Sequence, residues 1–473
     1  MKREPRPCKL VSSAALAASV SLASGSSLAA GFALIEQSVS GLGNAFAGGA
    51  AQAEDASAMF FNPAAMSELK GTQVSFGAHY INPESKLKDG TASVSAIGGT
   101  PTDFPVSGSL GGNAGQDAVV PHFHVVTDIT DVTKFGLGIS VPFGLETDYD
   151  DDWIGRYHAL QSRVRTVNIN PALSLKVHEK VSFGFGFNAQ YIDAKLTSAI
   201  DSGSTCFALA AQGGLDPNVV CAPAGLTPAN QATDSFGEFE GDDWAFGYNL
   251  GLMFSPWEST RFGLAYRSKL DQNVTGDGKF SLSPQFGALI DGLDPPRDTL
   301  FSCCNNVAAD VTLPASASVS ALHKLGQKFE IMGDITWTQW SEFDELRVRY
   351  IGSAVQPDAV TTQDWDDSFR YSIGLSYILN EKIKLRTGLA YDETPIKNPE
   401  RRTPRIPGED RIWTALGLTW QATEKFSFDV AYAHLFVDDP KINNTTEGTV
   451  EHTLQGEYDA SVDIVSAQVN YVF

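Results

Sequence analysis

The stretch from Lys180 to Tyr191 reads KVSFGFGFNAQY and alternates strictly between two kinds of side chain. One set is apolar: Val181, Phe183, Phe185, Phe187, Ala189 and Tyr191. The other set is small or polar: Ser182, Gly184, Gly186, Asn188 and Gln190. Because successive side chains of a strand point to opposite faces, this pattern predicts a strand that lies between two different environments.

The same alternation recurs along most of the chain. It is clear over residues 246–254, 369–377, 426–432 and 465–473. The predicted strands run to about 10–16 residues, whereas strands of soluble proteins average about five or six. Aromatic residues gather near the strand ends, as in the girdles of membrane barrels. The length and the aromatic distribution therefore favour a membrane-spanning sheet over a soluble sandwich.

The segments between the predicted strands alternate between short and long. Six short turns lie near residues 129–133, 178–180, 257–260, 324–327, 379–382 and 421–424. Seven long loops lie near residues 89–119, 147–160, 199–242, 276–308, 353–366, 397–410 and 438–458. These connections join fourteen strands, and an even number with short turns at one end is typical of a bacterial outer-membrane barrel. We therefore predict an all-β transmembrane barrel of fourteen antiparallel strands over residues 71–473, with its Phe, Tyr, Leu and Val face toward lipid.

The composition agrees with this class and argues against others. The chain has 473 residues, with 34 Lys and Arg against 56 Asp and Glu, for a formal net charge of −22. Binding to nucleic acid needs Lys and Arg facing phosphates, so no nucleic-acid partner is expected. Only 19% of the residues are charged, whereas about 25% is usual in soluble proteins.

Residues 1–29 are predicted to be a cleaved secretory signal peptide. Lys2, Arg3, Arg6 and Lys9 precede a short stretch of Ala, Val, Leu and Ser, and small residues at 27 and 29 suit a cleavage site. The stretch is too short for a transmembrane helix, and no later segment is apolar enough for one. We therefore expect an exported protein that enters a membrane as a barrel.

Residues 30–70 lack the period-two pattern and are predicted to form a small helical hatch, or plug, inside the lumen. The segment is rich in Ala and Gly, with short helical pieces broken by glycines. About forty residues cannot form a sizeable core alone. Their low charge and apolar side chains argue against a solvated tail. Small residues on the lumenal face of the strands leave room for such a plug.

Four cysteines follow the signal peptide: Cys206, Cys221, Cys303 and Cys304. An even number in an oxidising compartment suggests disulfides. A bridge between the adjacent Cys303 and Cys304 is disfavoured, because their Cα atoms lie about 3.8 Å apart, below the usual disulfide range. We favour Cys206–Cys221, which closes a loop worth about 3 kcal/mol in the chain-entropy model. Free thiols and pairing across loops are the alternatives. No CxxC pair is present, so zinc is not expected.

Several short motifs, in their order along the chain, resemble the FadL/TodX family of outer-membrane channels for hydrophobic compounds. They are Ala30-Gly31-Phe32, Ser40 to Gly43, Asp55-Ala56, Asn62-Pro63-Ala64, Pro142 to Leu145, Trp153 to Tyr157, Asn168 to Pro171, Trp340 to Phe343, Asp410 to Trp413 and Asn470 to Phe473. Each motif is weak alone, but together they cover essentially the whole mature chain. The resemblance implies a fourteen-stranded barrel with an N-terminal hatch that takes up long-chain fatty acids or aromatic hydrocarbons.

The resemblance also implies a route. In the family the ligand is captured among the outer loops, moves to a pocket behind the hatch, and leaves sideways through an inward kink in the third strand. Here that strand lies near Lys134–Leu145, with Pro142 and Gly144 as the irregular points. Burial of each CH₂ contributes about 0.8 kcal/mol, so such a path carries the solute downhill. The expected partners are the hydrophobic ligand, outer-membrane lipid and lipopolysaccharide, and the barrel assembly machinery.

Inward-facing arginines are the candidates for holding an anionic head group, because a guanidinium binds a carboxylate through paired hydrogen bonds. Because side chains alternate between the two faces of a strand, we expect Arg347, Arg370 and Arg411 to face the lumen. Trp413 lies on the same face as Arg411, where it can contact an acyl chain. Arg386 faces inward by the same argument. For each arginine, the alternative is a lumenal salt bridge with a nearby aspartate: Asp366, Asp367, Asp392 or Asp410.

The hatch supplies candidates for contact with the apolar part of the ligand. They are Phe32, Leu34, Phe46, Phe60 and Phe61, and packing of the plug against the wall is the alternative reading. The Asn62-Pro63-Ala64 motif is interpreted as a turn that fixes the hatch, with direct gating as a minor alternative. Apolar residues of two outer loops suggest a capture groove, unless the loops bury them against one another. They are Phe207, Leu209, Leu215, Phe286, Leu289, Ile290 and Leu293.

Other chemistry is sparse. His122 and His124 lie two apart on one strand face, but no third ligand is visible, so a structural role is favoured and no metal or cofactor is expected. The sequence contains no GxSxG, Walker or HExxH pattern, which argues against an enzyme. The rival functions are an aromatic or alkane hydrocarbon channel of the same fold and, from a different class, a general porin or an adhesive structural barrel. The inward arginines favour fatty acids.

Overall fold

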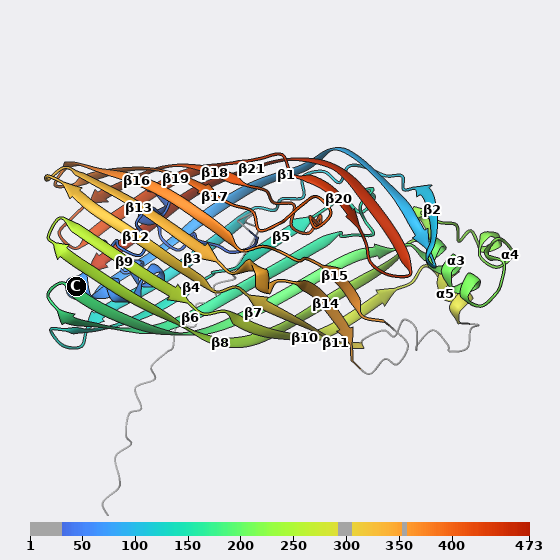
Figure 1. The fold of residues 1–473 in the computed structure, drawn as a ribbon, viewed down its shortest axis with the longest axis horizontal. Coiled ribbons are helices and arrows are strands. Elements are labelled where there is room, and N and C mark those ends of the chain that lie inside the picture. Colours follow the sequence, from blue (N-terminus) through green and yellow to red (C-terminus); the bar gives the residue numbers. More distant parts are fainter. Residues whose placement is uncertain (1–30, 292–304, 352–356) are drawn as a thin grey trace, which may run out of the picture.

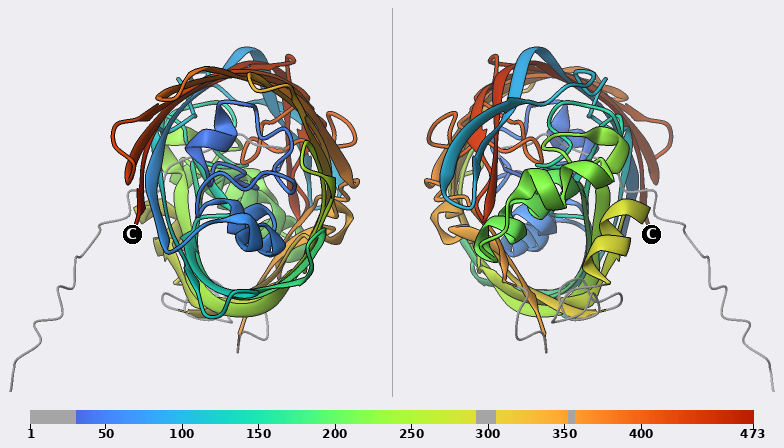
Figure 2. Two further views of the ribbon diagram at one scale, coloured as in Figure 1. Left: turned by 90° about the vertical axis from the view of Figure 1, so that its left-hand side faces the viewer. Right: turned by 90° about the vertical axis from the view of Figure 1, so that its right-hand side faces the viewer.

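The computed structural model describes residues 31–291, 305–351 and 357–473. The predicted signal peptide, Leu293, Cys303 and Cys304 lie outside the described residues. Within them the chain forms one closed barrel that surrounds its N-terminal segment (Figure 1 and Figure 2). No helix in the described ranges is long and apolar enough to cross a membrane.

Fourteen antiparallel strands, several of them interrupted, follow one another around the wall, as the sequence predicts. In chain order they are β1 (Gln73–Ile97), β3 (Ala118–Asp128), β4 (Thr133–Ser140) with β5 (Gly144–Asp148), β6 (Gln161–His178), β7 (Val181–Ile200), β8 (Ser235–Trp257), β9 (Thr260–Arg267) with β10 (Leu270–Ser281), β11 (Asn305–Leu313) with β12 (Ser316–Leu325), β13 (Phe329–Thr338) with β14 (Glu345–Tyr350), β15 (Ala359–Thr362) with β16 (Ser368–Asn380), β17 (Ile383–Asp392), β18 (Arg411–Gln421), β19 (Phe426–Val437) with β20 (Lys441–Thr445), and β21 (Val450–Val472). The short β2 (Thr100–Pro105) pairs with the end of β1. Pairing of β1 with β21, from Gln73↔Val472 to Ile97↔Val450, closes the barrel.

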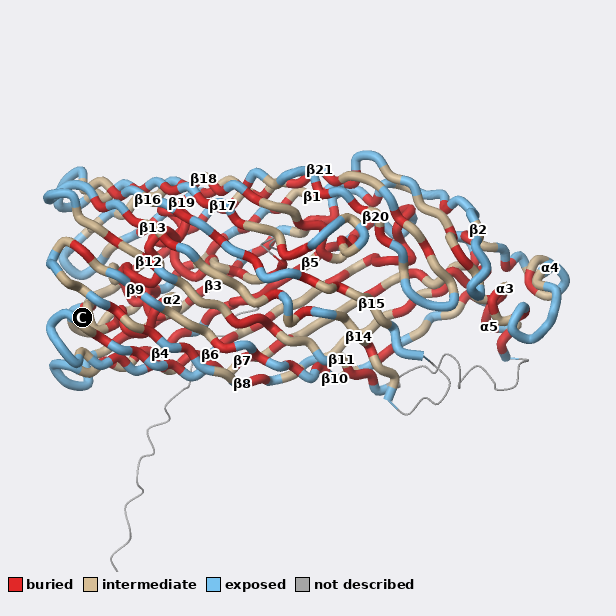
Figure 3. The backbone as a smooth tube through the Cα atoms, viewed as in Figure 1, coloured by how far each residue is buried: buried red, intermediate tan, exposed pale blue. Residues whose placement is uncertain are grey.

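The two faces of the wall separate by side-chain type. In β7, Phe183 and Phe185 are about half exposed on the outside, whereas Gly184 and Gly186, which alternate with them, are buried. Buried and exposed residues alternate along the strands in Figure 3. The apolar face thus lies where lipid tails can cover it, which is favourable by about 0.8 kcal/mol for each CH₂. The short turns and the C-terminus share one end of the barrel (Figure 1).

The long loops at the other end carry helices. They are α3 (Ser202–Gln212), α4 (Pro217–Val220), η2 (Ala222–Ala224), η3 (Gln231–Thr233) and α5 (Pro284–Ile290), and α3 lies across this end in Figure 2. The Cys206–Cys221 disulfide that the sequence favours joins α3 to the residue after α4. Phe286 and Ile290 are fully buried against this disulfide, with Phe207, Leu209 and Leu289 packed around them. These loop residues therefore pack against one another, which is the predicted alternative to a capture groove.

The N-terminal segment lies inside the barrel (Figure 2) and contains α1 (Val39–Leu42), α2 (Ala58–Phe61) and η1 (Pro63–Glu68). Asn62 caps η1, because its Oδ1 accepts a hydrogen bond from the Ala64 amide at 2.9 Å, and Pro63 occupies the first position of the turn. The Asn62 Nδ2 also donates to the Leu252 carbonyl of β8 at 3.1 Å. The Asn62-Pro63-Ala64 turn therefore attaches the hatch to the wall.

Two wall glycines admit the hatch at close range. A Cβ atom at Gly388 would lie 2.1 Å from the carbonyl carbon of Asn44, and one at Gly251 would lie 1.9 Å from Asn62 Oδ1. Both distances are far below van der Waals contact, so any larger residue at either position would push the hatch away from the wall. The small residues on the lumenal face of the strands thus provide the space in which the hatch packs against the wall.

Candidate functional site

The third strand of the wall is broken at the residues that the family resemblance indicates. β4 ends at Ser140 and β5 begins at Gly144, and the three residues between them turn toward the hatch. The Pro142 carbonyl accepts a hydrogen bond from the Leu34 amide at 2.8 Å, and the Gly144 amide donates to the Phe32 carbonyl at 3.0 Å. The start of the hatch thus forms a short antiparallel pair with this kink.

The kink interrupts the hydrogen bonding around the barrel. β3 and β4 pair only as far as Phe123↔Ile139. Residues 118–122 of β3 pair with β1 on one side, and no other described strand pairs with them on the other. The kink is held by the hatch instead: Gln37 Nε2 donates to the Val141 carbonyl at 2.6 Å, and the Val141 amide donates to Gln37 Oε1 at 3.2 Å.

A cavity of about 130 Å³ lies between the hatch, the kink and the opposite wall. Its lining residues are Ala33, Leu34, Ile35, Phe60, Pro142, Phe143, Arg267, Pro314, Ser316, Thr336, Thr338, Ser368, Arg370, Asp392 and Trp413. A second cavity of about 90 Å³ shares Ile35, Phe60 and Arg267 with it and extends to Phe46 and Phe61. The first cavity thus lies directly behind the broken strand.

Arg370 in β16 supplies a cation to this cavity. Its side chain is buried inside the barrel, on the face that strand parity predicts. Its Nη2 donates to the Ala45 carbonyl at 2.8 Å, and its Cζ lies 4.9 Å from the Trp413 ring and 5.7 Å from the Phe46 ring. Its Nε and Nη1 have no hydrogen-bond partner among the described residues. Arg370 is therefore a stacked, desolvated cation with free donors.

Arg411 lies beside Arg370 at the start of β18. Asp392 is the cross-strand neighbour of both arginines, through the pairs Arg370↔Asp392 and Asp392↔Arg411. Arg411 is fully buried, and its Nη1 has no hydrogen-bond partner in the described part of the chain. No ion pair within 4.0 Å joins either arginine to an acid among the described residues, so the predicted alternative of a direct salt bridge does not account for them.

Sequence reasoning missed Glu36, the acid that faces this arginine pair from the hatch. Glu36 is fully buried, and apart from its own backbone amide its carboxylate has no hydrogen-bond partner among the described residues. Burial raises the pKa of Glu36 to about 7, against the charges of Arg370 and Arg411, which lower it. The available signal was an acid that directly follows the apolar stretch FALI at residues 32–35.

The aromatic candidates divide into two groups. Phe46, Phe61 and Trp413 form one cluster, with ring centroids 5.7 Å apart for Phe46–Phe61 and 6.3 Å apart for Phe46–Trp413. Phe60 lies beside Phe61 at 5.2 Å, beneath the guanidinium of Arg267 at 4.6 Å. The structure brings these side chains to the cavities.

Phe32 belongs to a different cluster. Its ring packs against Trp340 at 4.9 Å and Phe343 at 5.7 Å, at η4 (Trp340–Glu342) and just after it, and against Phe143 of the kink at 6.0 Å. Phe32 therefore contributes to the packing of the kink and does not line the cavity. Leu34, two residues later, does line it.

The inward direction predicted for Arg347 is wrong. Its guanidinium pairs with Glu345 at 2.6 Å and Asp358 at 3.1 Å, and its side chain is 41% exposed. The neighbouring Leu346 packs instead against the interior cluster around Trp340. The prediction assumed that the apolar face of a strand always meets lipid. Here the segment between β13 and β14 places aromatic rings inside the barrel, so the apolar face of β14 turns inward to cover them.

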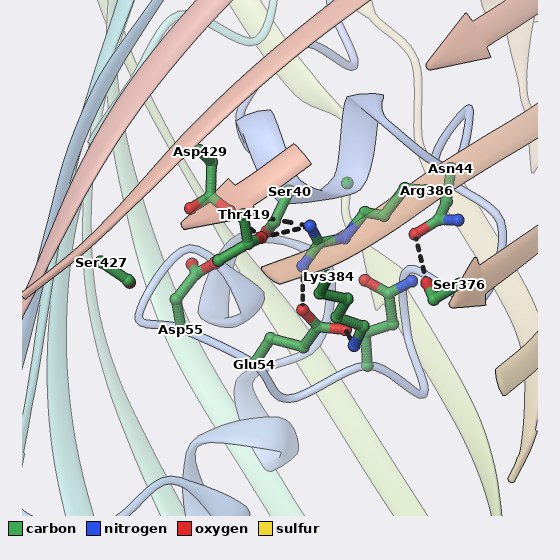
Figure 4. Close-up of polar contacts among 12 residues, drawn as sticks. Ser40, Asn44, Glu54, Asp55, Ser376, Lys384, Arg386, Thr419, Ser427 and Asp429 are labelled. Carbon is green, nitrogen blue, oxygen red and sulfur yellow. Dashed lines mark hydrogen bonds and ion pairs between the residues drawn. The ribbon is translucent and has the colours of Figure 1, made fainter. Parts of the chain in front are cut away.

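A polar network clamps the hatch to the wall away from the cavity (Figure 4). Glu54 of the hatch pairs with Arg386 and with Lys384 of β17, at 2.6 Å for Lys384, and Arg386 also contacts Thr419. Burial raises the pKa of Glu54, but the charges of Arg386 and Lys384 outweigh that effect and hold the pKa below its usual range. Arg386, which the alternation of faces along the strand predicts to point inward, thus anchors the hatch.

His122 and His124 are joined by a third buried histidine, His79. The ring centroids are 5.2 Å apart for His79–His122 and 5.6 Å apart for His122–His124. His122 Nε2 lies 2.9 Å from Gln468 Oε1, which also accepts a hydrogen bond from the Val39 amide of the hatch at 3.1 Å. Within the described ranges, no group of three or more His, Cys, Asp or Glu side chains has an arrangement that suits a metal ion.

Comparison with known proteins gives the same architecture. The E. coli O6:H1 long-chain fatty acid transport protein is 29% identical over 467 residues, covering 98% of this chain and 99% of that protein. The 47 kDa outer membrane protein of Pasteurella multocida is 32% identical over 444 residues, covering 93% and 94%. The crystal structure of a Pseudomonas aeruginosa FadL homologue matches with a TM-score of 0.82 at 25% identity, covering 94% of this chain and all of that one.

A family model settles the assignment. The model described as outer membrane protein transport protein (OMPP1/FadL/TodX) matches residues 20–473. The strand number and the enclosed hatch agree with that match. The chain therefore belongs to the FadL/TodX family of outer membrane transport proteins and is a protein of the bacterial outer membrane.

Proposed function

We propose that the protein carries hydrophobic compounds passively across the outer membrane and that its ligands are long-chain fatty acids. The observation that supports this most directly is Arg370, a buried guanidinium with two unpartnered nitrogens that lines the cavity behind the kink. Such a group suits a carboxylate. Relatives named as long-chain fatty acid transport proteins support the same ligand class.

The apolar lining suits the remainder of such a ligand. Leu34, Ile35, Phe60, Phe143 and Trp413 surround the cavity, and Phe46 and Phe61 continue it. Each CH₂ moved from water into such surroundings gains about 0.8 kcal/mol. We therefore place the head group at Arg370, with Arg411 as the second cation, and the acyl chain among the hatch aromatics.

We infer that the ligand leaves sideways through the gap beside β3. Pro142 and Phe143 line the cavity and also form the kink, so one displacement of this segment connects the cavity with the outside of the wall. Residues 118–122 of β3 pair with β1 but have no described strand partner on the side of β4 and β5, so no barrel hydrogen bonds need to break on that side. The segment is held by a few hydrogen bonds to the hatch and by two between Phe143 and the Thr166 hydroxyl of β6, which accepts from the Phe143 amide at 3.1 Å and donates to its carbonyl at 2.6 Å.

Entry is proposed at the helical cap on the long-loop end. Most of its apolar residues pack together, but Leu215 and Val219 are 55% and 71% exposed. We place first contact with the ligand there. We also infer that residues 1–29 are removed on export, that residues 30–70 and 71–473 are the hatch and the barrel, and that lipopolysaccharide and the assembly machinery are its neighbours. No catalytic step is proposed.

The test is uptake of radiolabelled oleate and, separately, toluene by cells that lack their own transporter. The variants are Arg370→Leu and the matched control Arg347→Leu, which lies outside the cavity. A hydrogen bond to a charged group contributes about 1.5–3 kcal/mol, so we expect Arg370→Leu to lower apparent oleate affinity by roughly tenfold to a hundredfold. Arg347→Leu should behave as wild type.

Other results would favour the rival functions. Uptake of toluene alone, unchanged in Arg370→Leu, would assign the protein to the hydrocarbon branch of the fold. Entry of small polar solutes with no uptake of either compound would leave a general porin. A barrel that transports nothing would leave the adhesive or structural role.

A further inference from the structure

Glu36 directly follows Leu34 and Ile35, which line the cavity behind the kink. The residue lies on the extended start of the hatch and is fully buried. Arg370 from β16, Arg411 from β18 and Asp392 from β17 are the charged groups that act on it. Asp334 and Asp410 act in turn on the two arginines. Glu36 therefore belongs to the charge balance of the arginine pair.

The arginine donors nevertheless remain free. The Glu36 carboxylate accepts no hydrogen bond from either arginine, and Nε and Nη1 of Arg370 and Nη1 of Arg411 have no partner among the described residues. The charges of the two arginines thus act on Glu36, and no hydrogen bond joins Glu36 to their free donors. A buried site of this kind has cations available for an anion and a negative charge that opposes the arrival of that anion.

The same short segment holds the kink. The Leu34 amide bonds to the Pro142 carbonyl, and the Gln37 side chain makes two hydrogen bonds to the backbone of Val141. Glu36 lies between these two attachments in the sequence. Any change that moves Glu36 therefore strains the contacts by which the hatch closes the gap beside β3.

We propose that Glu36 competes with the ligand head group for Arg370 and Arg411, and that its neutralisation on ligand binding loosens residues 34–37 from the kink. This inference rests on the proposed function, because it concerns the same cavity. When a ligand anion takes the arginine donors, a second negative charge lies beside Glu36 and the cations no longer compensate it. Glu36 then takes up a proton from solvent and loses its attraction to the wall.

The test uses two probes with the full-length mature protein in lipid nanodiscs. Hexadecyl sulfonate carries a charge that does not titrate between pH 6 and 8, and hexadecanol is its neutral counterpart. For a group with a pKa of about 7, the ionised fraction is about nine tenths at pH 8 and about one tenth at pH 6. We expect wild-type affinity for the sulfonate to rise about tenfold from pH 8 to pH 6, with hexadecanol unaffected.

Glu36→Gln should remove this pH dependence and bind the sulfonate at pH 8 about tenfold more tightly than wild type. The matched control Glu84→Gln, at an exposed position of β1, should keep the wild-type profile. Heat-modifiable migration in gels checks that each variant is folded. If Glu36→Gln does not fold, calorimetry of the wild type in two buffers gives the proton uptake. We expect about 0.9 proton per sulfonate at pH 8 and about 0.1 at pH 6.

Hydrogen exchange reports the second half of the proposal. The peptide covering residues 31–37 should exchange faster with sulfonate bound, and hexadecanol should have no such effect. Sulfonate binding without pH dependence, or without proton uptake, would overturn the role of Glu36 and leave the proposed function intact. Binding of hexadecanol with no binding of the sulfonate would instead overturn the carboxylate specificity itself.

Discussion

Arg370 is the residue around which the site is arranged, and its burial has a cost. A guanidinium with unsatisfied donors inside a barrel is unfavourable unless something compensates it. Here the compensation comes from the Trp413 ring at 4.9 Å, the Phe46 ring and one hydrogen bond to Ala45. A desolvated cation–π contact of this kind contributes about 2 kcal/mol. The remaining free donors are what a ligand can use.

Replacing Trp413 should therefore affect both halves of the ligand. We expect Trp413→Leu to lower affinity for hexadecyl sulfonate by about tenfold or more, because Arg370 loses its stacking partner, and to weaken hexadecanol binding as well. Arg370→Leu should weaken the sulfonate alone. Titration of both probes in nanodiscs measures this, with Trp257→Leu, 66% exposed on the outer face, as the control. Unchanged hexadecanol affinity in Trp413→Leu would contradict the placement of the acyl chain.

Residue-level prediction succeeded where a strand supplied the direction of the side chain. Arg370, Arg411 and Arg386 all point inward because period-two geometry fixes their faces. It failed for Arg347, where interior aromatic rings reverse which face is apolar. It missed Glu36 because the hatch is neither a regular strand nor a long helix. Without a period, the sequence carries no information on where its side chains point.

At the scale of elements, the hatch is attached by two unlike regions. At its start, residues 32–37 make a few hydrogen bonds to the kink. Farther on, Glu54 is clamped by Arg386 and Lys384, and the Asn62 turn is seated on β8. Charged, buried clamps resist opening more than a few backbone hydrogen bonds do. The start of the hatch is thus the part suited to move while the rest stays in place.

Breaking the clamp should turn the barrel into a leaky pore. We expect Glu54→Gln to free the hatch, because it removes the partner of two cations, and to admit polar solutes. Conductance steps in planar bilayers and vancomycin sensitivity of cells would measure the leak. Glu84→Gln is the control, since its ion pair with Lys86 is exposed. If the Glu54→Gln barrel shows no leak, the hydrogen bonds of the hatch to the wall and the kink are sufficient to hold it in place.

The pH dependence of this clamp follows from the same charges. The folded-state pKa of Glu54 lies below its usual range, so its stabilisation is present above the ordinary pKa of about 4.3 and is lost as the pH falls through the folded value. The wild-type barrel should therefore show no leak conductance between pH 5 and 8. Glu36, whose pKa is raised to about 7, takes up a proton as the pH falls within that range. A pH titration therefore distinguishes the two attachments of the hatch.

For the molecule as a whole, β1 and β21 close the barrel, and the interruption of the wall between β4 and β5 lies beside the cavity. The interruption at β4 and β5 faces the start of the hatch, and the helical cap covers the other end. A solute that enters at the cap and leaves at the kink never has to cross the polar clamp. The arrangement therefore supports sideways passage better than passage along the axis.

A reversible lock between the hatch and the kink tests this route. Ala33 and Phe143 form an isolated antiparallel bridge whose flanking hydrogen bonds mark it as a non-hydrogen-bonded pair. Cα atoms of such pairs lie about 4.5 Å apart, within reach of a disulfide. We expect the oxidised Ala33→Cys/Phe143→Cys protein to stop oleate uptake and a reductant to restore it. The two single-cysteine variants, treated alike, control for the reductant. Full uptake by a completely cross-linked protein would exclude this exit.

The sequence by itself determined the number of strands, the two faces of the wall and an N-terminal segment too short to form its own core. The strand features are local, because alternation at period two acts over a few residues. The broken third strand was expected only from the family resemblance, and the position of the hatch came from the tertiary structure. Only the tertiary structure decided how the site is assembled. The hydrogen bond from Arg370 to Ala45 joins residues 325 apart, and the one from Arg386 to Glu54 joins residues 332 apart. No pattern along the chain specifies such pairs. They arise because the closed wall forces the hatch to bury its groups against the strands that surround it.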